Sequence, residues 1–552
     1  MVHFETRCLS SLSKVFADEE LKDTAFSSAS ALRGESYSFQ VAYRCNKGIR
    51  PLEIKLESTI QGNAYYRLVG LSPSDLPCFD DFDENVLRST PGMYPDPLYT
   101  PEVTEAAALP NQWRSVWITV EIDPNALEGS HSISVQFEDE NKQTLGREVF
   151  HLNIIPATLP PQRLLRTEWF HADCLADYYK CPILSEEHWK RISQFMQTAA
   201  KHGMNMILTP LFTLPLDTEM GGERPTLQLV KIFKSGDHYR FEFDQLKRWI
   251  DLCNIHRIQY VEFSHLFTQW GAEHAPKIMA DVSGQSVQIF GWETDSTGEE
   301  YTLFLNQFLP ELVSFIKEEE LTERCYFHVS DEPYLEHMDT FKQVSQLIKS
   351  HLEGFPIFDA LSNYEFYTMG LVETPVVAID HIDVFIKNEV PSLWAYYCVS
   401  QRQKVSNRFF HMPSARNRMI GIQLYKFAIK GFLHWGYNFY FSQFSRKSID
   451  PFRVTDADQR FPSGDSFIVY PGPSGPIESI RLEVMLEAMQ DIRAFELLES
   501  YIGKDQVIKM IEEGLDHPIT FSEYPHSLDW LLEVRNKVNQ AISVSAGKQV
   551  HI

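Results

Sequence analysis

Two adjacent carboxylic acids, Asp331 and Glu332, follow a run of residues typical of a buried strand, residues 326–330 (YFHVS). Pro333 closes the stretch; it has no backbone N–H for a sheet and biases Glu332 towards an extended backbone. Successive side chains in a strand point to opposite faces, but both acids can face one cavity where the strand ends. The pair could therefore work as a general acid and base, although an exposed acidic turn has the same composition.

The acids need a scaffold that gathers strand ends, and the chain after residue 162 alternates predicted strands and helices. The strands are predicted at 165–171, 205–211, 259–263, 326–330, 355–360, 376–380, 393–397 and 431–439. Helical spacing of apolar residues is found between most of them, at 186–202, 243–256, 302–319, 338–351 and 417–430, while 365–374 is helix-poor. This alternation favours a (β/α)8 TIM barrel over a doubly wound sheet, and the usual dinucleotide glycine motif is missing.

The regions on either side of the barrel have different patterns. Residues 1–157 alternate apolar and polar residues in short runs, which predicts an antiparallel β-sandwich. Within it, the proline-rich stretch 90–98 is predicted to be an ordered loop against the next domain. A stiff linker at 155–161 precedes the barrel at 163–476. Residues 477–552 are predicted to form helices packed on the flank of the barrel.

Polar and aromatic residues gather where the predicted strands end or in the loops that follow. Each alone is better explained by core packing. Their joint occurrence at one face of a barrel favours a sugar-sized binding pocket. The candidates for substrate binding are His171, His265, Trp270, Asn363, Asp380, Trp394, Tyr396, Tyr397, Trp435 and Asn438.

A metal-dependent hydrolase is the main competing interpretation. Ligands could come from His171, His265, His328, Asp331 and Asp380. The sequence lacks an H-x-H pair on the first barrel strand and an H-E-x-x-H helix, and it also lacks G-x-S-x-G and a glycine-rich phosphate loop. We therefore expect neither a metal nor a cofactor.

The composition limits the possible partners and compartments. A net charge of −25 argues against nucleic acid and anionic membranes as partners, because both would be repelled. We find no secretory signal and no apolar run of the ~20 residues that a membrane span needs. The 8 cysteines are scattered, which is typical of free thiols. These features predict a cytoplasmic protein without membrane insertion, and they leave the oligomeric state open.

Several stretches resemble glycoside hydrolase family 123, the β-N-acetylgalactosaminidases. They are residues 91–98 (PGMYPDPL), 328–333 (HVSDEP), 433–438 (LHWGYN), 464–471 (GDSFIVYP) and 479–483 (SIRLE), in the family's order. The resemblance implies a sandwich followed by a barrel. It also implies a retaining, exo-acting hydrolase that releases terminal β-linked GalNAc from glycolipid or oligosaccharide with help from the substrate. The family's Asp-Glu pair corresponds to Asp331 and Glu332.

This chemistry suits neighbouring acids. An ordinary retaining glycosidase needs two carboxyls ~5 Å apart on opposite sides of the sugar, which sequence neighbours cannot easily supply. If the 2-acetamido oxygen is the nucleophile, Asp331 would stabilise the oxazolinium and Glu332, with a raised pKa, would be the acid and base.

Other pocket roles, and two other functions, stay open. Either Tyr396 or Tyr397 would hold the acetamido oxygen, and Trp394 or Trp435 would stack under the sugar. A β-N-acetylglucosaminidase with the same mechanism and a non-catalytic glycan-binding protein remain alternatives.

Overall fold

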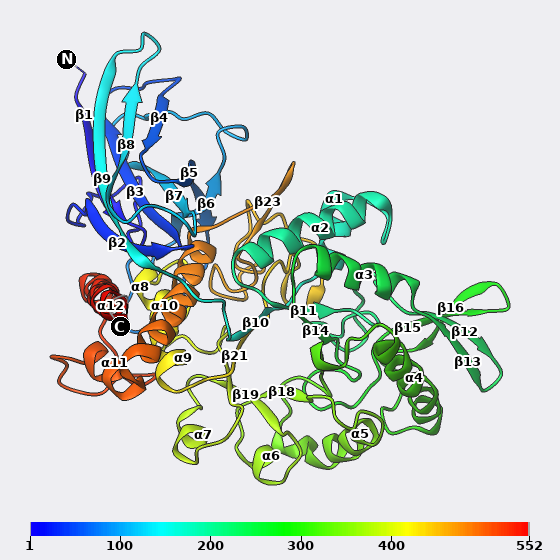
Figure 1. Ribbon diagram of the computed structural model, residues 1–552. Coiled ribbons are helices and arrows are strands. Elements are labelled where there is room, and N and C mark those ends of the chain that lie inside the picture. Colours follow the sequence, from blue (N-terminus) through cyan, green and yellow to red (C-terminus); the bar gives the residue numbers. More distant parts are fainter. Residues whose placement is uncertain (1, 550–552) are drawn as a thin grey trace.

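The N-terminal part of the computed structural model, which describes residues 2–549, consists of two packed β-sheets (Figure 1). Their strand orders are β1-β3-β7-β5-β6 and β2-β9-β8-β4. The bounds are β1 Phe4–Ser10, β2 Ser28–Arg33, β3 Ser36–Cys45, β4 Glu53–Ser58, β5 Gly62–Ser74, β6 Gly92–Tyr99, β7 Arg114–Ile122, β8 Gly129–Glu138 and β9 Thr144–Thr158. The pairs are antiparallel except β2 with β9, which is parallel. Alternate residues such as Phe39, Val41 and Ile118 form the core between the sheets.

The proline-rich stretch predicted as a loop is instead the edge strand β6, which pairs with β5. An edge strand tolerates Pro95 and Pro97 because the backbone groups on its open side have no neighbouring strand that would need an N–H donor. The expected contact with the rest of the chain is present. Asp96 forms a buried ion pair with Arg481 at 2.8 Å, and Pro97 forms an isolated antiparallel β-bridge with Ser479. The strand therefore joins the sandwich to the C-terminal region.

All eight predicted strands of the middle region are present, most of them shorter than expected. Their bounds are β10 Leu165–Glu168, β11 Met206–Thr209, β14 Tyr260–Phe263, β17 Cys325–Phe327, β18 Phe358–Leu361, β19 Thr374–Ala378, β20 Trp394–Tyr396 and β21 Gly431–His434. They form two parallel sheets, one of five strands (β10-β21-β20-β19-β18) and one of three (β11-β14-β17).

The hydrogen bonds between these strands do not make a continuous eight-stranded ladder. A single bridge between Phe327 and Ile357 links β17 to the strand that follows. At the other junction, the N–H of Arg166 donates to the side chain of Asn205, 2.8 Å away, and not to a strand carbonyl. The expected closed barrel is therefore not confirmed by the strand ladder, although the order of the strands follows the chain.

Helices follow most of these strands, as the apolar spacing predicted. They are α1 Ala172–Tyr179, α2 Glu186–Lys201, α3 Asp244–Ile255, α4 Glu299–Glu318, α5 Met338–His351, α6 Glu365–Thr368, α7 Asp383–Lys387, α8 Ser414–Arg418 and α9 Ile420–Lys426. Helix α2 starts where Ser185 accepts a hydrogen bond from the N–H of His188. The stretch predicted to be helix-poor contains only the 4-residue α6, and the helix predicted at 417–430 is divided into α8 and α9.

A separate four-stranded sheet projects from one side of this region, at the right in Figure 1. It combines two hairpins that the sequence did not reveal, inserted after β11 and β14. Its strands are β12 Lys231–Ser235, β13 His238–Glu242, β15 Ile278–Val282 and β16 Gln285–Phe290. Short 3-10 turns occur at Thr322–Arg324, Leu335–His337 and Gln443–Ser445.

The C-terminal helices contact both large parts of the molecule. They are α10 Ile480–Ile502, α11 Lys504–Ile511 and α12 Leu528–Gln549, preceded by the small hairpin β22 Tyr470–Gly472 and β23 Gly475–Ile477. Arg535 of α12 pairs with Glu35 of the sandwich at 2.7 Å and with Asp491 of α10 at 2.9 Å. Arg418 of α8 pairs with Asp491 of α10 at 2.7 Å, so the extension packs on the sandwich as well as on the middle region. Among residues 2–549, no helix combines the length and apolarity needed to cross a bilayer.

Candidate functional site

A cavity of about 440 Å³ lies at the C-terminal ends of the parallel strands. Asp331 and Glu332 line it, with Trp270, Tyr396 and Trp435 from the residues predicted to bind substrate. Its remaining walls come from Trp169, Leu216, Asp217, Gln269, Tyr334, Ala360, Cys398, Val399, Leu433, Gln443, Phe444 and Phe461. The volume and the mixture of aromatic and carboxylate side chains suit a small polar ligand with an apolar face.

Both acids reach the same cavity because the backbone leaves the strand before them. Strand β17 ends at Phe327, and Glu332 has a φ of 45°, so the expectation of an extended Glu332 is wrong. A non-glycine residue keeps this left-handed conformation only where its surroundings hold it. The N–H of Glu332 donates to the carbonyl of Ala360 at 3.1 Å, and the carbonyl of Asp331 accepts from the N–H of Trp270 at 3.0 Å. Strand β18 and the loop after β14 thus fix the pair.

The acids share an environment that favours retention of a proton. Burial raises the pKa of Asp331, and the negative charge of Glu332 raises it further; the amide of Gln269, which donates to Asp331 Oδ2 at 2.6 Å, opposes the shift. Burial also raises the pKa of Glu332, against a hydrogen bond from the Tyr396 hydroxyl at 2.6 Å. Two adjacent buried acids are not easily ionised together, so one can stay protonated as a proton donor while the other is a carboxylate.

A buried charge network lies beneath the cavity. The ring of His328 contacts Glu262 through Nε2 at 2.6 Å and Asp359 through Nδ1 at 3.3 Å. Burial lowers the pKa of His328, but these carboxylates outweigh it and raise the pKa to about 9. As an imidazolium, His328 donates from both nitrogens. Glu262 also accepts from the indole N–H of Trp169 at 2.7 Å, so the network orients an aromatic side chain of the cavity wall.

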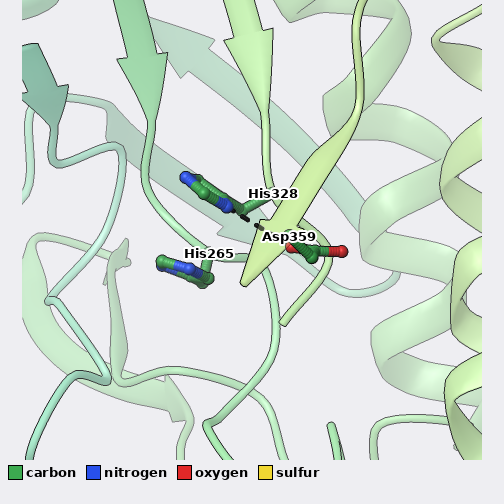
Figure 2. A group of neighbouring side chains, drawn as sticks. All are labelled: His265, His328 and Asp359. Atoms are coloured by element: carbon green, nitrogen blue, oxygen red, sulfur yellow. Dashed lines mark hydrogen bonds and ion pairs between the residues drawn. The ribbon is translucent and has the colours of Figure 1, made fainter. Parts of the chain in front are cut away.

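His265, His328 and Asp359 lie close enough together to be considered as a metal site. The imidazoles of His265 and His328 are stacked, with ring centroids 4.1 Å apart and planes 22° from parallel. Figure 2 shows the three side chains. A metal lies close to the plane of each imidazole that binds it, so rings stacked in this way cannot share one ion. Both nitrogens of His328 are also engaged by carboxylates. These three residues, as arranged, do not fit a metal centre.

A second such cluster, His202, Glu478 and Glu483, is also explained without a metal. Both of its carboxylates pair with Arg67, and His202 contacts Glu483 at 3.2 Å. The cluster is an ion network between the sandwich and α10.

Five residues predicted to bind substrate are buried outside the cavity: His171, His265, Trp394, Tyr397 and Asn438. The side chain of Asn438 binds the backbone of His171 through both its oxygen and its nitrogen, at 2.9 and 3.1 Å. The His171 ring contacts the carbonyl of Trp435 at 2.9 Å. These polar groups therefore support the cavity wall and do not line it.

Strand geometry separates the three aromatic residues in and directly after β20. Tyr396 lines the cavity, whereas the hydroxyl of Tyr397 points to the opposite face and donates to Asn417 at 3.1 Å. Trp394 shares the face of Tyr396 but lies deeper, packed on Phe358 with ring centroids 5.1 Å apart. Alternation along the strand and depth below its end decide which aromatic residue reaches the cavity.

Two further candidates lie near the cavity without lining it. Asp380 is exposed and accepts a hydrogen bond from Gln401 at 2.9 Å, yet its charge contributes to the raised pKa of Glu332. Asn363 is half-buried after β18. Their contribution to the site is at most indirect in this structure.

The loops after β11 and β14 bring two further polar residues to the cavity, Asp217 and Gln269, which the sequence did not predict. The side-chain oxygen of Gln269 accepts from the N–H of Asp217, while its amide nitrogen donates to Asp331. The only available signal was position, because both residues follow strands whose ends meet at this face.

Comparison with known proteins identifies the family of this region. The sequence profile described as "Glycoside hydrolase 123, catalytic domain" matches residues 169–498. No functionally curated protein matches the chain.

Among solved structures, a family 123 glycoside hydrolase from Clostridium perfringens, described in connection with glycolipid glycan hydrolysis, is similar over 99% of both chains. It has a TM-score of 0.76 and 15% sequence identity. An endo-β-1,4-mannanase from Thermotoga petrophila matches 60% of this chain and 77% of its own, with a TM-score of 0.35 and 13% identity. The first similarity shows that the fold extends over the whole chain.

Proposed function

The chain belongs to glycoside hydrolase family 123, and on that premise we propose that it is a retaining exo-β-N-acetylgalactosaminidase. Its substrate is a terminal β-linked GalNAc on a glycolipid or an oligosaccharide. The glycolipid assignment is supported by the description of the similar Clostridium perfringens enzyme. The observation that carries the proposal is the adjacent pair Asp331 and Glu332, which both line one cavity of about 440 Å³.

The mechanism follows from having two neighbouring acids. The acetamido oxygen of the substrate attacks the anomeric carbon as the bond to the leaving oxygen breaks, and Glu332 gives its proton to that oxygen. Asp331 accepts a hydrogen bond from the acetamido N–H and stabilises the positive oxazolinium. Water then attacks the anomeric carbon, Glu332 takes its proton, and the oxazolinium opens with net retention.

We also propose that the two parallel sheets are the halves of a (β/α)8 barrel, and that the chain divides into domains 1–157, 163–476 and 477–552. The support is the strand order and the loss of regular pairing at only two junctions.

Comparing aryl β-GalNAc, β-GlcNAc and β-galactoside substrates tests the proposed activity. We expect the fastest cleavage for GalNAc and a loss of at least about 100-fold for the galactoside, which has no intramolecular nucleophile. Similar rates on the galactoside would overturn substrate assistance and make Asp217, the third carboxylate of the cavity, a candidate nucleophile. Preference for GlcNAc would indicate a β-N-acetylglucosaminidase. Binding of GalNAc without turnover of any glycoside would indicate a glycan-binding protein.

A further inference from the structure

Asp217 is a third carboxylate in the cavity, and the mechanism above does not use it. It lies on the loop after β11 with a φ of 40°. Its N–H donates to Gln269, and its carbonyl accepts from the Ser445 hydroxyl at 2.7 Å. Its Oδ2 accepts from the N–H of Phe444 at 3.1 Å. Contacts from two other segments, the loop after β14 and residues 443–445, therefore hold this aspartate in one position.

The second carboxylate oxygen of Asp217 remains available to a ligand. Within residues 2–549, Oδ1 has no hydrogen-bond donor and the carboxylate forms no ion pair. Burial raises the pKa of Asp217 to about 6, although the Phe444 N–H opposes the shift, so the group is mostly ionised at neutral pH. Asp217 is partly exposed and lines the cavity, so Oδ1 can be reached by a ligand that supplies a neutral donor.

Asp217 and Glu332 line the same cavity but are held by different parts of its wall. Asp217 Oδ2 accepts from the N–H of Phe444, in the segment after β21. Glu332 is held by Ala360 of β18 and by the hydroxyl of Tyr396 of β20. A sugar with its anomeric carbon beside Glu332 would extend its far edge towards Asp217.

We propose that Asp217 determines specificity by accepting a hydrogen bond from one hydroxyl of the terminal sugar remote from the anomeric carbon, at O3, O4 or O6. This inference rests on the proposed glycosidase function and deepens it. The free oxygen accepts the hydroxyl proton, while Oδ2 stays on Phe444. A site built to bind a hydroxyl discriminates strongly against a sugar that lacks it, because its buried acceptor is then left unpaired.

The test combines Asp217→Ala with 3-deoxy, 4-deoxy and 6-deoxy forms of whichever aryl β-glycoside the wild-type enzyme cleaves fastest. The wild type should lose roughly 10- to 100-fold in kcat/KM on one deoxy substrate, as expected for a hydrogen bond to a charged group. Asp217→Ala should lose a similar factor on the parent sugar and nothing further on that deoxy form. Using the fastest parent keeps the test valid even if the preferred sugar is not GalNAc.

Glu219→Gln is the matched control. Glu219 lies on the same loop as Asp217 and does not line the cavity. It pairs at 2.6 Å with Arg446, which is in the same segment as Phe444, the partner of Asp217. The Glu219→Gln variant should act like the wild type on every substrate. Equal losses for Asp217→Ala on the parent and all deoxy forms, or losses shared by Glu219→Gln, would overturn the inference and show that Asp217 only anchors loops. An unchanged Asp217→Ala enzyme would also overturn it.

Calorimetric titration with the free parent sugar provides a second measurement that does not depend on turnover. It compares Glu332→Gln with the double variant that also carries Asp217→Ala. The double variant should bind the parent sugar roughly 10- to 100-fold more weakly. Equal affinity would contradict a hydroxyl contact, even if no glycoside is cleaved.

Discussion

The hydroxyl of Tyr396 donates a 2.6 Å hydrogen bond to Oε1 of Glu332, which connects the end of β20 to the loop after β17. The bond opposes the effect of burial on the Glu332 pKa, because it stabilises the ionised form. In the proposed mechanism, Glu332 must be protonated in the first step and ionised in the second. Tyr396 is therefore placed to adjust how readily Glu332 releases and regains its proton.

Replacing Tyr396 with Phe tests this relationship. The variant should lose roughly 10- to 100-fold in kcat on an aryl β-GalNAc substrate, since a hydrogen bond to a charged group disappears. The alkaline limb of its kcat/KM profile should move to higher pH, because the Glu332 pKa rises without its donor. Tyr397→Phe is the control; its hydroxyl points away from the cavity to Asn417, so activity should change less than about 3-fold. Equal effects from both variants would contradict a specific role for Tyr396.

The two acids should respond differently to the leaving group. Glu332→Gln removes the proton donor, so we expect a loss of about 100-fold or more on poor leaving groups such as alkyl alcohols and a smaller loss on nitrophenolate. Asp331→Asn should lose activity on all substrates, because stabilisation of the oxazolinium does not depend on the leaving group. Rates measured across a series of leaving-group pKa values distinguish these patterns. Near-wild-type rates in both variants would place the active site elsewhere.

Activity should require a pair that carries one proton. Burial raises the pKa of both Asp331 and Glu332, so the alkaline limb of the kcat/KM profile should lie above the ordinary carboxyl range of roughly 4. Activity falls at low pH when both acids are protonated and at high pH when both are ionised. The two apparent pKa values belong to the pair. A flat profile between pH 4 and 9 would be inconsistent with this shared proton.

The buried network around His328 should make stability depend on pH. Its pKa is raised to about 9, above its ordinary value of roughly 6.5 in an unfolded chain. The stabilisation is therefore complete below about pH 6.5 and is lost as the pH rises through 9. At pH 7, His328→Gln should lower the free energy of unfolding by about 3–5 kcal/mol, because it leaves Glu262 and Asp359 without their cation.

Urea unfolding at pH 7 and pH 9.5 measures this effect. Asp359, whose pKa is raised to about 6 by burial against the opposing effect of His328, stays mostly ionised over this interval. The difference in the free energy of unfolding between the wild type and His328→Gln should be smaller at pH 9.5 than at pH 7. His265→Gln is the control; burial holds the pKa of His265 well below its ordinary value, so its destabilisation should be the same at both pH values. A constant difference for His328→Gln would show that His328 is not charged.

Chelator treatment separates the proposed mechanism from metal-dependent hydrolysis. We expect EDTA dialysis to leave both kcat and Tm unchanged, because the stacked rings of His265 and His328 cannot bind one ion. Activity lost in EDTA and restored by a divalent cation would contradict this expectation.

Sequence alone determined the order of the elements and the location of the acids. Apolar spacing predicted the eight parallel strands, and a carboxylate pair after the fourth of them was sufficient to place the candidate site at the strand ends. The quoted stretches were sufficient to recognise the family. These properties are local or depend on a short motif, so one amino-acid sequence is enough to predict them.

Only the tertiary structure decided which side chains share the cavity. Tyr396 and Tyr397 are neighbours in sequence, but strand alternation turns their hydroxyls to opposite faces. Asp217 and Gln269 come from separate loops with no motif, and their contacts with Phe444 and Asp331 join distant segments. Glu332 leaves the extended backbone that Pro333 favours because contacts with strand β18 and with the loop after β14 hold its segment. Long-range contacts override local preferences, and a single sequence does not reveal them.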